Sequence, residues 1–344
     1  MTAPSQHVLL LDAKQKRLNA GPKARLDTAF FLGNLGFRIQ SVPTSRSRYW
    51  QRLLAWALRV SNWVSFKATD VVWCQFPVDK STAAVLEKAR RQGLRTVAFV
   101  HDIEGLKPAR TDWDSVAEQA QQLKSFAAVL GLNEVIGRIL QQHGVAVAAN
   151  LNLWDYVCSP PPAQSLSRGL NKRIVFAGSL AADKSPFIYR LAPLAGLRFE
   201  LYGQGMDAGM PLAPHVRYAG SFEPESPPFQ ADGAIGLVWD GPEITTCGGD
   251  FGAYLAFNTP HKASMYLARG LPVAVWKDAA IAPLIAQHGA GLLVASLHEL
   301  EQRVSTLSTE QYAAMASNAA RLGEEIRAGH FITHAAVKLQ ASLA

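Results

Sequence analysis

In the first half of the chain, short apolar runs alternate with longer segments in which apolar side chains recur at helical spacing. The short runs are typical of buried strands, and the longer segments of amphipathic helices. The predicted strands are His7–Leu11, Phe37–Val42, Asp70–Phe76, Arg95–Val100, Ala127–Leu130 and Val145–Ala148. The predicted helices between them are Pro22–Leu35, Tyr49–Phe66, Thr82–Arg91, Ser115–Lys124 and Glu134–Gln142. Strands separated by helices of about ten residues or more indicate βαβ units and a parallel sheet.

The alternation stops at Val157–Asn171, where three prolines, serines and a glycine are typical of a linker. It then resumes, with a helical end at Glu310–Leu343 and strands predicted at Arg173–Ala177, Arg198–Tyr202, Val216–Ala219, Ala234–Trp239, Pro272–Trp276 and Gly291–Val294. The sequence therefore predicts an α/β protein with two doubly wound, parallel-sheet domains of the Rossmann type, residues 1–157 and 172–344, joined by a linker at 158–171. Two such domains facing a central cleft describe GT-B glycosyltransferases, some sugar-nucleotide epimerases and hinge-type binding proteins, among which the fold alone does not choose.

The composition is that of a cytoplasmic protein with a large core. Hydrophobic residues make up 49% of the 344 positions, which is enough for two domains. No run of about 18 apolar residues could cross a bilayer, and the first residues lack the pattern of a secretory signal. The three cysteines, Cys74, Cys158 and Cys247, have no metal or redox spacing, so we interpret them as buried thiols in a reducing compartment.

Positive charge is concentrated in the first half. Residues 1–157 hold 20 Lys+Arg against 12 Asp+Glu, a net +8, and the remainder holds 14 against 15, a net −1, which together give the formal +7. A basic half predicts an anionic partner such as nucleic acid, a membrane surface or a phosphorylated substrate. Nucleic acid is disfavoured because no recognised binding module occurs.

One segment of this basic half, Arg46–Lys67, combines arginines with an apolar stripe at helical spacing and the three tryptophans Trp50, Trp56 and Trp63. Two interpretations fit this pattern. The stripe packs in the core or against a sister subunit, or it lies at the interface of a membrane with water.

In the second half, one helix begins with the wrong charge. Thr259 as N-cap and Gly270 as C′ residue predict a helix at Pro260–Arg269. His261 and Lys262 then lie in its first turn, where a cation costs about 0.3–1 kcal/mol against the helix dipole. A bound anion would remove the conflict, which makes Lys262 a candidate phosphate ligand. The alternative is that Lys262 points into water.

Two further strand ends are expected at the same edge of the second domain. Gly178-Ser179 follows the first strand, and Ser185 is predicted to cap a helix beside Lys184. Gly203-Gln204-Gly205 follows the second strand, where glycines allow the backbone to approach a planar group closely. The alternative at each turn is ordinary strand-to-loop geometry.

The chain resembles a bacterial family of GT-B glycosyltransferases in several stretches: NKRIVFAGSLAADKSPFIYRL, LYGQG, GLVWDG and GDFGAYLAFNTPHKASMYLARGLPVAVWKDAAIA in the second half, and GPKARLD and HDIEGLK in the first. This family includes O-antigen β-1,6-galactofuranosyltransferases and glucosyltransferases that extend GlcNAc on serine-rich adhesins. The resemblance is dense from Asn171 to Leu300 and sparser in the first domain, and residues 43–69 show no clear match.

The resemblance implies that the second domain holds a UDP-sugar donor. Lys262 and Asn258 would face the diphosphate, and Asp240, Glu243 and Asp250 are candidates for the sugar hydroxyls, with Asp250 preferred. The complete set of implied donor-binding residues is Ser179, Lys184, Gly203, Asp250, Tyr254, Asn258 and Lys262.

Departing UDP needs neutralising charge, and the sequence has no convincing DxD pair at a strand end. Because lysines and helix dipoles can stabilise the same charge, we expect an enzyme that needs neither a metal nor a cofactor. The acceptor hydroxyl needs a base, and Asp102 and Glu104 follow the strand Arg95–Val100. They are the candidate catalytic residues; the alternative is that Asp102 caps the loop and Glu104 is solvated.

The glycine turn Asn19–Lys23 follows the first strand and is expected at the same rim. Gly21, Lys23, Arg25 and His101 are therefore candidates for contacts with the acceptor or with phosphate, although His101 could equally be a buried structural histidine.

These observations predict a cytoplasmic glycosyltransferase that moves galactofuranose or glucose from a UDP-sugar to a glycan acceptor. We expect a lipid-linked acceptor at the inner membrane face and inversion at the transferred sugar. The alternatives are a transferase that extends a sugar on a glycoprotein and a sugar-nucleotide-binding scaffold without turnover. A homo-oligomer is possible in each case, and nucleic acid is not expected as a partner.

Overall fold

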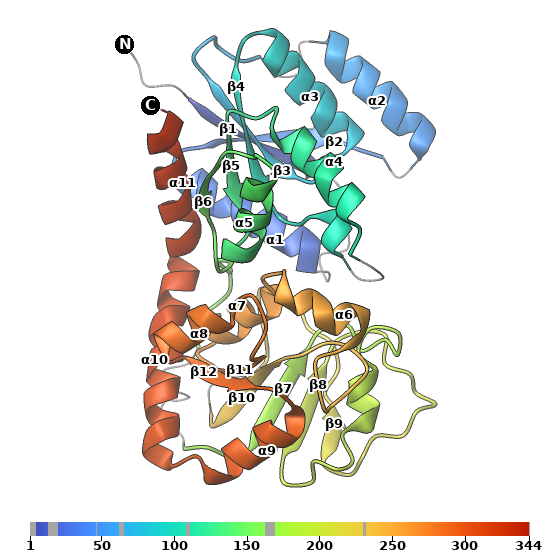
Figure 1. The fold of residues 1–344 in the computed structure, drawn as a ribbon, viewed down its shortest axis with the longest axis vertical. Coiled ribbons are helices and arrows are strands. Elements are labelled where there is room, and N and C mark those ends of the chain that lie inside the picture. The colour runs from blue at the N-terminus through green and yellow to red at the C-terminus, as the bar shows by residue number, and fades with distance from the viewer. Residues whose placement is uncertain are drawn as a thin grey trace. The chain divides into compact units, whose positions relative to one another are not determined.

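The structure is a computed structural model that describes residues 5–12, 20–45, 47–61, 65–107, 111–161, 169–229 and 232–343. The chain forms two units, each built around its own sheet (Figure 1). The first unit comprises the described residues up to Gly105, Asp112–Leu151 and those from Phe331 onward. The second comprises Asn152–His330 and the described residues of Leu106–Thr111.

Within the described residues, six parallel strands form the sheet of the first unit. Their order across the sheet is β2-β1-β3-β4-β5-β6. The strands are β1 (Gln6–Asp12), β2 (Arg38–Pro43), β3 (Val71–Phe76), β4 (Arg95–Val100), β5 (Ala128–Gly131) and β6 (Val147–Asn150). Every residue of β3 is buried, as expected of a strand whose continuous apolar run is covered on both faces.

Helices lie on both faces of this sheet (Figure 1). They are α1 (Ala20–Asn34), α2 (Arg48–Val60), α3 (Lys80–Arg91), the short 3₁₀ helix η1 (Glu104–Leu106), α4 (Trp113–Leu123), α5 (Glu134–Gln142) and α11 (His330–Leu343). Polar N-caps start three of them: the side chains of Asp79, Asp112 and Asn133 accept backbone N–H bonds from the first turns of α3, α4 and α5. These caps satisfy donors that a helix start leaves unpaired.

The second sheet likewise has six parallel strands among the residues that the structure describes. Their order is β12-β11-β10-β7-β8-β9. The strands are β7 (Arg173–Ala177), β8 (Arg198–Tyr202), β9 (Val216–Tyr218), β10 (Ala234–Val238), β11 (Val273–Trp276) and β12 (Gly291–Val294). The helices are η3 (Pro186–Arg190), α6 (Gly249–Ala253), η4 (Tyr254–Ala256), α7 (His261–Ala268), α8 (Ala282–His288), α9 (Leu297–Thr306) and α10 (Thr309–Ala328).

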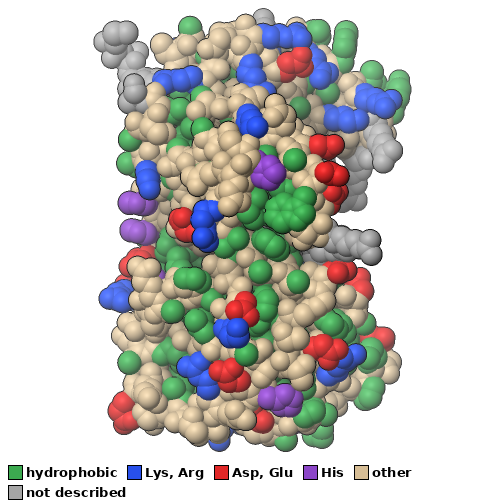
Figure 2. All heavy atoms as spheres, viewed as in Figure 1, with side chains coloured by type: hydrophobic (Ala, Val, Ile, Leu, Met, Phe, Trp, Pro, Cys, Tyr) green, Lys and Arg blue, Asp and Glu red, His purple; other side chains and the backbone are tan. Residues whose placement is uncertain are grey.

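Surface charge differs along the molecule. In the view of Figure 2, most Lys and Arg side chains of the first unit gather toward the end where Figure 1 draws α2 and α3. Among the described helices, none is both long and apolar enough to cross a membrane.

The predicted fold class is confirmed, since both units are doubly wound parallel α/β structures. The end of the chain differs from the prediction in one respect. The helical segment Glu310–Leu343 is two helices, because Gly329 ends α10 with a φ of +77°, a conformation that glycine adopts without strain. The second of these helices, α11, belongs to the first unit, a grouping that apolar periodicity alone does not reveal.

Candidate functional site

The order of strands in the second sheet locates a binding edge. From β7 the chain proceeds to β8 and β9 on one side, and then returns to β10, β11 and β12 on the other. The direction of winding therefore reverses between the neighbours β7 and β10. Ligands of doubly wound sheets bind outside the carboxyl ends of the strands at such a switch point.

Lys262 lies at this switch point, in the first turn of α7. Its Nζ is 3.0 Å from each carboxylate oxygen of Asp240 and donates to the carbonyl oxygen of Trp239 at 3.1 Å. The same amine lies 4.6 Å from the centre of the Phe176 ring, at the end of β7. The side chains of Lys262 and Asp240 are only 15% and 10% exposed.

Burial lowers the pKa of the Lys262 amine below its usual value, and the nearby Lys184 acts in the same direction, whereas Asp240 raises it. Two sequence expectations need correction. Lys262 does not point into water, and the charge conflict at the helix start is already relieved by Asp240, which follows β10. Both oxygens of Asp240 face Lys262, so the structure gives Asp240 an ion-pairing role, and its contact with a sugar stays a prediction.

Two glycines bring the loops after β7 and β8 together. Gly203 has a φ of +143°, and a Cβ atom there would lie 1.8 Å from the carbonyl oxygen of Gly178. The backbone N–H of Gly178 donates to the carbonyl oxygen of Tyr202, and that of Leu180 donates to the carbonyl oxygen of Gln204. The close backbone approach at Gly203 is therefore to the neighbouring loop, and an approach to a planar ligand group stays a prediction. The Lys262 amine lies directly beside this junction, 3.7 Å from the Cβ position of Gly178.

The start of α7 has polar groups that the fold does not use. Pro260 is the N-cap, one residue later than predicted, and no side chain caps the helix. The side-chain oxygen of Asn258 is buried and has no hydrogen-bond partner among the described residues. Tyr254 precedes this turn, and its carbonyl accepts the Asn258 N–H at 3.1 Å. An uncapped helix start beside a buried, unsatisfied oxygen is a place where a polar ligand can bind.

The other residues predicted to bind the sugar donor differ in their exposure and contacts. Lys184 is half-buried, with its amine 5.7 Å from the Phe251 ring. Ser179 directly follows the Gly178 junction and is half-buried. Asp250 is exposed in the first turn of α6. Glu243, by contrast, forms an ion pair with Arg190 at 2.5 Å.

One predicted cap is wrong. Ser185 precedes η3 as expected, but its side chain makes no capping bond, and its hydroxyl oxygen is buried without a partner among the described residues. The 3₁₀ turn of η3 replaces the predicted helix.

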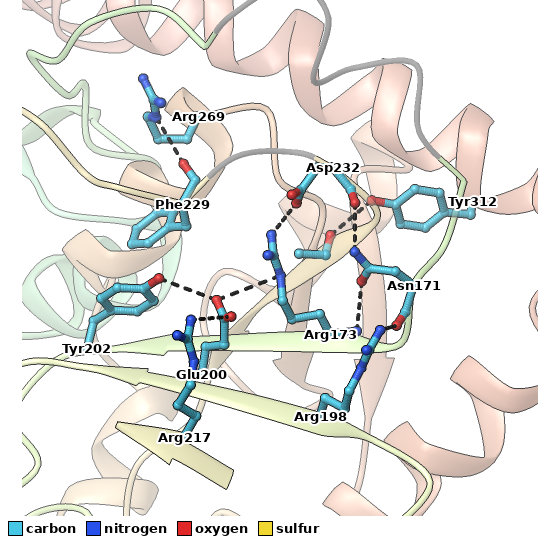
Figure 3. Close-up of polar contacts among 11 residues, drawn as sticks. Asn171, Arg173, Arg198, Glu200, Tyr202, Arg217, Phe229, Asp232, Arg269 and Tyr312 are labelled. Carbon is cyan, nitrogen blue, oxygen red and sulfur yellow. Dashed lines mark hydrogen bonds and ion pairs between the residues drawn. The ribbon is translucent and has the colours of Figure 1, made fainter. Parts of the chain in front are cut away.

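A second polar network in this unit serves the fold and lies at the strand starts (Figure 3). Glu200 on β8 accepts from Arg217 at 2.8 Å and lies 3.8 Å from Nε of Arg173, which begins β7. Arg173 also pairs with Asp232, just before β10. Tyr312 of α10 donates to the carbonyl of Ala234 at 3.0 Å. These contacts tie four strands and a helix together.

In the first unit, the candidate acid–base residues lie at the carboxyl end of β4. The Asp102 carboxylate accepts the backbone N–H of Ile103 at 2.9 Å, and the Glu104 N–H donates to Gln119 at 2.7 Å. Asp102 is half-buried and Glu104 is exposed. The Asp102 bond agrees with the loop-capping alternative, and proton acceptance by either carboxylate remains a prediction. The centre of the His101 ring lies 4.8 Å from that of the Phe99 ring, and the two rings are tilted by 44°.

Arg25 joins this cluster from α1. Its guanidinium donates to the carbonyl oxygens of Gln75 at 2.7 Å and Pro77 at 3.1 Å, at the end of β3. Burial lowers the pKa of Arg25, while nearby negative groups, which include Asp102 and Glu104, raise it. The structure therefore brings Arg25 within electrostatic reach of both candidate carboxylates.

The predicted glycine turn at Asn19–Lys23 is wrong, because its described residues are helical. Gly21 and Lys23 lie within the first turns of α1, which begins at Ala20, and Asn19 lies outside the described residues. Lys23 is buried and pairs with Asp27 at 2.5 Å. The two residues are four positions apart on one helix, so their side chains lie on the same face. Lys23 therefore has a structural partner and is not exposed, as a contact with phosphate would require.

Two doubly wound units with parallel six-stranded sheets are the architecture of GT-B glycosyltransferases. Solved structures of this class share the fold: Anabaena HepE, crystallised with UDP and glucose, has a TM-score of 0.62 and 15% identity over 97% of this chain and 99% of its own. Sucrose-phosphate synthase from Thermosynechococcus elongatus has a TM-score of 0.67 and 12% identity over 98% and 99%.

The chain belongs to the glucosyltransferase 3-like family, because the models of its N-terminal and C-terminal domains match residues 7–152 and 174–339. A β-1,6-galactofuranosyltransferase, WbbI of Escherichia coli K12, is 28% identical over 94% of both chains. Glucosyltransferase 3 of Streptococcus gordonii is 26% identical over 76% of both. The protein is therefore a glycosyltransferase enzyme, and the predicted family is confirmed.

Proposed function

We propose that the protein transfers a hexosyl unit, galactofuranose or glucose, from a UDP-sugar to a glycan acceptor. The observation that carries this proposal is the buried Lys262 amine at the switch point, in the first turn of α7, which no side chain caps. A lysine in the first turn of a helix suits a diphosphate, because the positive end of the helix dipole adds to its charge. The relatives named for galactofuranosyl and glucosyl transfer support the two sugars.

Four finer parts belong to the same proposal. The acceptor is lipid-linked, the protein works on the cytoplasmic side of the membrane, the configuration of the transferred sugar inverts, and no metal is needed. Lys262 and Lys184 stabilise the departing UDP electrostatically, and Asp102 or Glu104 accepts the proton of the acceptor hydroxyl. A glycoprotein acceptor is the alternative, suggested by the adhesin-modifying members of the family.

A donor panel tests the proposal. We expect transfer from UDP-galactofuranose or UDP-glucose, but not from GDP-linked sugars, to a synthetic lipid-linked glycan, with NMR spectroscopy reporting an inverted anomeric configuration. Transfer only to a glycopeptide would favour the alternative acceptor. Activity should persist in excess EDTA, and full loss that Mg²⁺ or Mn²⁺ restores would overturn metal independence.

A further inference from the structure

Helix α2 carries apolar residues on two opposite faces. Ala55 and Leu58 are buried, and α2 packs beside α3 (Figure 1). On the other face, the side chains of Tyr49, Trp50, Leu53, Trp56 and Val60 are between 39% and 66% exposed. At 100° per residue these five positions form one continuous strip along the helix, which we call the α2 strip. Trp63, which continues the pattern in the sequence, lies outside the described residues.

The fold itself does not require the α2 strip. Two polar contacts already hold α2 on α3: Arg59 pairs with Glu87 at 2.8 Å, and Lys88 donates to the carbonyl of Ser61 at 2.5 Å. Both contacts, together with the buried Ala55 and Leu58, act on the side turned to α3. Exposed apolar patches of this kind mark surfaces that bind a partner.

The charge around the α2 strip indicates the partner. Arg52 and Arg59 lie along one edge of the strip and are exposed. Residues 47–95, which include α2 and α3, hold nine Lys+Arg and three Asp+Glu. Blue and green side chains accordingly lie together over α2 in Figure 2. Tryptophan and tyrosine beside arginine suit the level of lipid headgroups, where the rings remain half-hydrated and the cations meet phosphates.

A second copy of the chain fits the same strip less well. Two α2 helices packed antiparallel about a two-fold axis place the same edges opposite each other. Arg52 and Arg59 of one copy would then face the arginines of the other, and such like-charge contacts oppose association. An anionic bilayer has no such conflict, because the arginines at the edge of the strip would face negative charge.

We propose that the α2 strip docks the first unit on an anionic phospholipid membrane, with α2 parallel to the surface and Trp50 and Trp56 in the headgroup layer. This inference builds on the proposed function, since a lipid-linked acceptor lies at such a surface. Docking by one short helix is reversible and depends on salt, because each Lys or Arg near an anionic surface strengthens binding about five-fold and is screened by ions.

Co-sedimentation with vesicles tests the inference on the full chain. We expect binding at low salt to vesicles of phosphatidylcholine with about one-third phosphatidylglycerol, weaker binding in high salt, and little binding to phosphatidylcholine alone. The variant Trp56→Gln/Val60→Gln should bind at least about ten-fold more weakly, because it removes two apolar contacts with the interface. Trp113→Gln, which changes a similarly exposed tryptophan at the start of α4, is the matched control and should bind like the unmodified protein.

Brominated lipids provide a second measurement without any variant. We expect them to quench part of the tryptophan fluorescence of the unmodified protein, and the double variant should lose that quenching while its melting temperature stays unchanged. The inference is overturned if the protein ignores anionic vesicles at low salt, or if both variants bind equally. It is also overturned if the double variant only dissociates an oligomer. Transfer to a water-soluble glycan is measured in parallel, so that an unmodified protein that ignores anionic vesicles but still transfers sugar contradicts docking and leaves the proposed function standing.

Discussion

At the scale of single residues, the buried Lys262–Asp240 ion pair sets the charge and the stability of the proposed donor site. The amine is held by two carboxylate oxygens and a carbonyl at 3.0–3.1 Å in a buried position. Removing Lys262 therefore leaves Asp240 without its cation. Buried charges that lose a partner are costly.

We expect Lys262→Ala to weaken UDP binding by roughly 1.5–3 kcal/mol, the range for a hydrogen bond to a charged group, and to lower the free energy of unfolding by about 1–3 kcal/mol. Calorimetric titration with UDP and urea denaturation measure the two effects. Lys277→Ala is the control, because its pair with Asp278 is exposed and should contribute about 0–1 kcal/mol. The double variant Lys262→Met/Asp240→Asn should recover stability without recovering UDP affinity. Unchanged UDP affinity in Lys262→Ala would contradict the phosphate role.

A second residue-scale prediction concerns the base. Asp102→Asn and Glu104→Gln keep the shape of the side chain and remove proton acceptance, so one of them should lower kcat by about 10²–10⁴-fold with UDP binding intact. We favour Asp102, which is closer to the end of β4. Glu118→Gln on the exposed face of α4 is the control. Normal turnover in both variants would place the base elsewhere.

At the scale of elements, the junction of the β7 and β8 loops depends on one glycine. Gly203→Ala would place a Cβ atom 1.8 Å from the Gly178 carbonyl oxygen, so one of the two loops must move. Gly220→Ala is a matched control, since its φ is also positive, at +90°, but nothing lies within 4 Å of the new atom.

We expect Gly220→Ala to cost about 1–2 kcal/mol from backbone strain alone, with UDP affinity unchanged. Gly203→Ala should lower the melting temperature more than Gly220→Ala does. It should also weaken UDP binding, because the displaced Gly178 loop lies against the Lys262 amine. Equal effects of the two substitutions would show that the loop junction does not support the site.

At the scale of the whole molecule, the three cysteines report on burial in both units. Cys74 in β3 and Cys247 are buried, and Cys158 is half-buried. Burial raises the pKa of the Cys74 and Cys247 thiols to about 12. Because the thiolate is the reactive form, both thiols should resist modification in the folded protein.

We therefore expect Ellman's reagent at pH 8 to modify Cys158 first in the native protein, and all three thiols in denaturant.

The raised pKa values of the buried thiols also affect the stability of the protein at high pH. Unfolded thiols lose their protons near pH 9, whereas the folded ones keep them to about pH 12, so the folded state binds more protons in this window and stability falls as pH rises. In the variant Cys74→Ala, the free energy of unfolding should fall less steeply as the pH rises from 9 to 12, because one of the shifted thiols is gone. Rapid reaction of all three native thiols would contradict the burial.

The doubly wound fold follows from the sequence alone, because continuous apolar runs between amphipathic helices can bury both of their faces only in a parallel sheet covered on both sides. The sequence also indicated the binding edge of the second unit, since Gly178 and Gly203 directly follow strands and Lys262 lies in the first turn of a helix. The contact partners of those residues, in contrast, became visible in the three-dimensional structure. Asp240 is 22 positions from Lys262, and Gly178 is 25 positions from Gly203. Such contacts depend on strand order, which local periodicity does not encode. The same reason explains why Lys23 proved to be buried, why α11 joins the first unit, and why the second apolar face of α2 remains exposed.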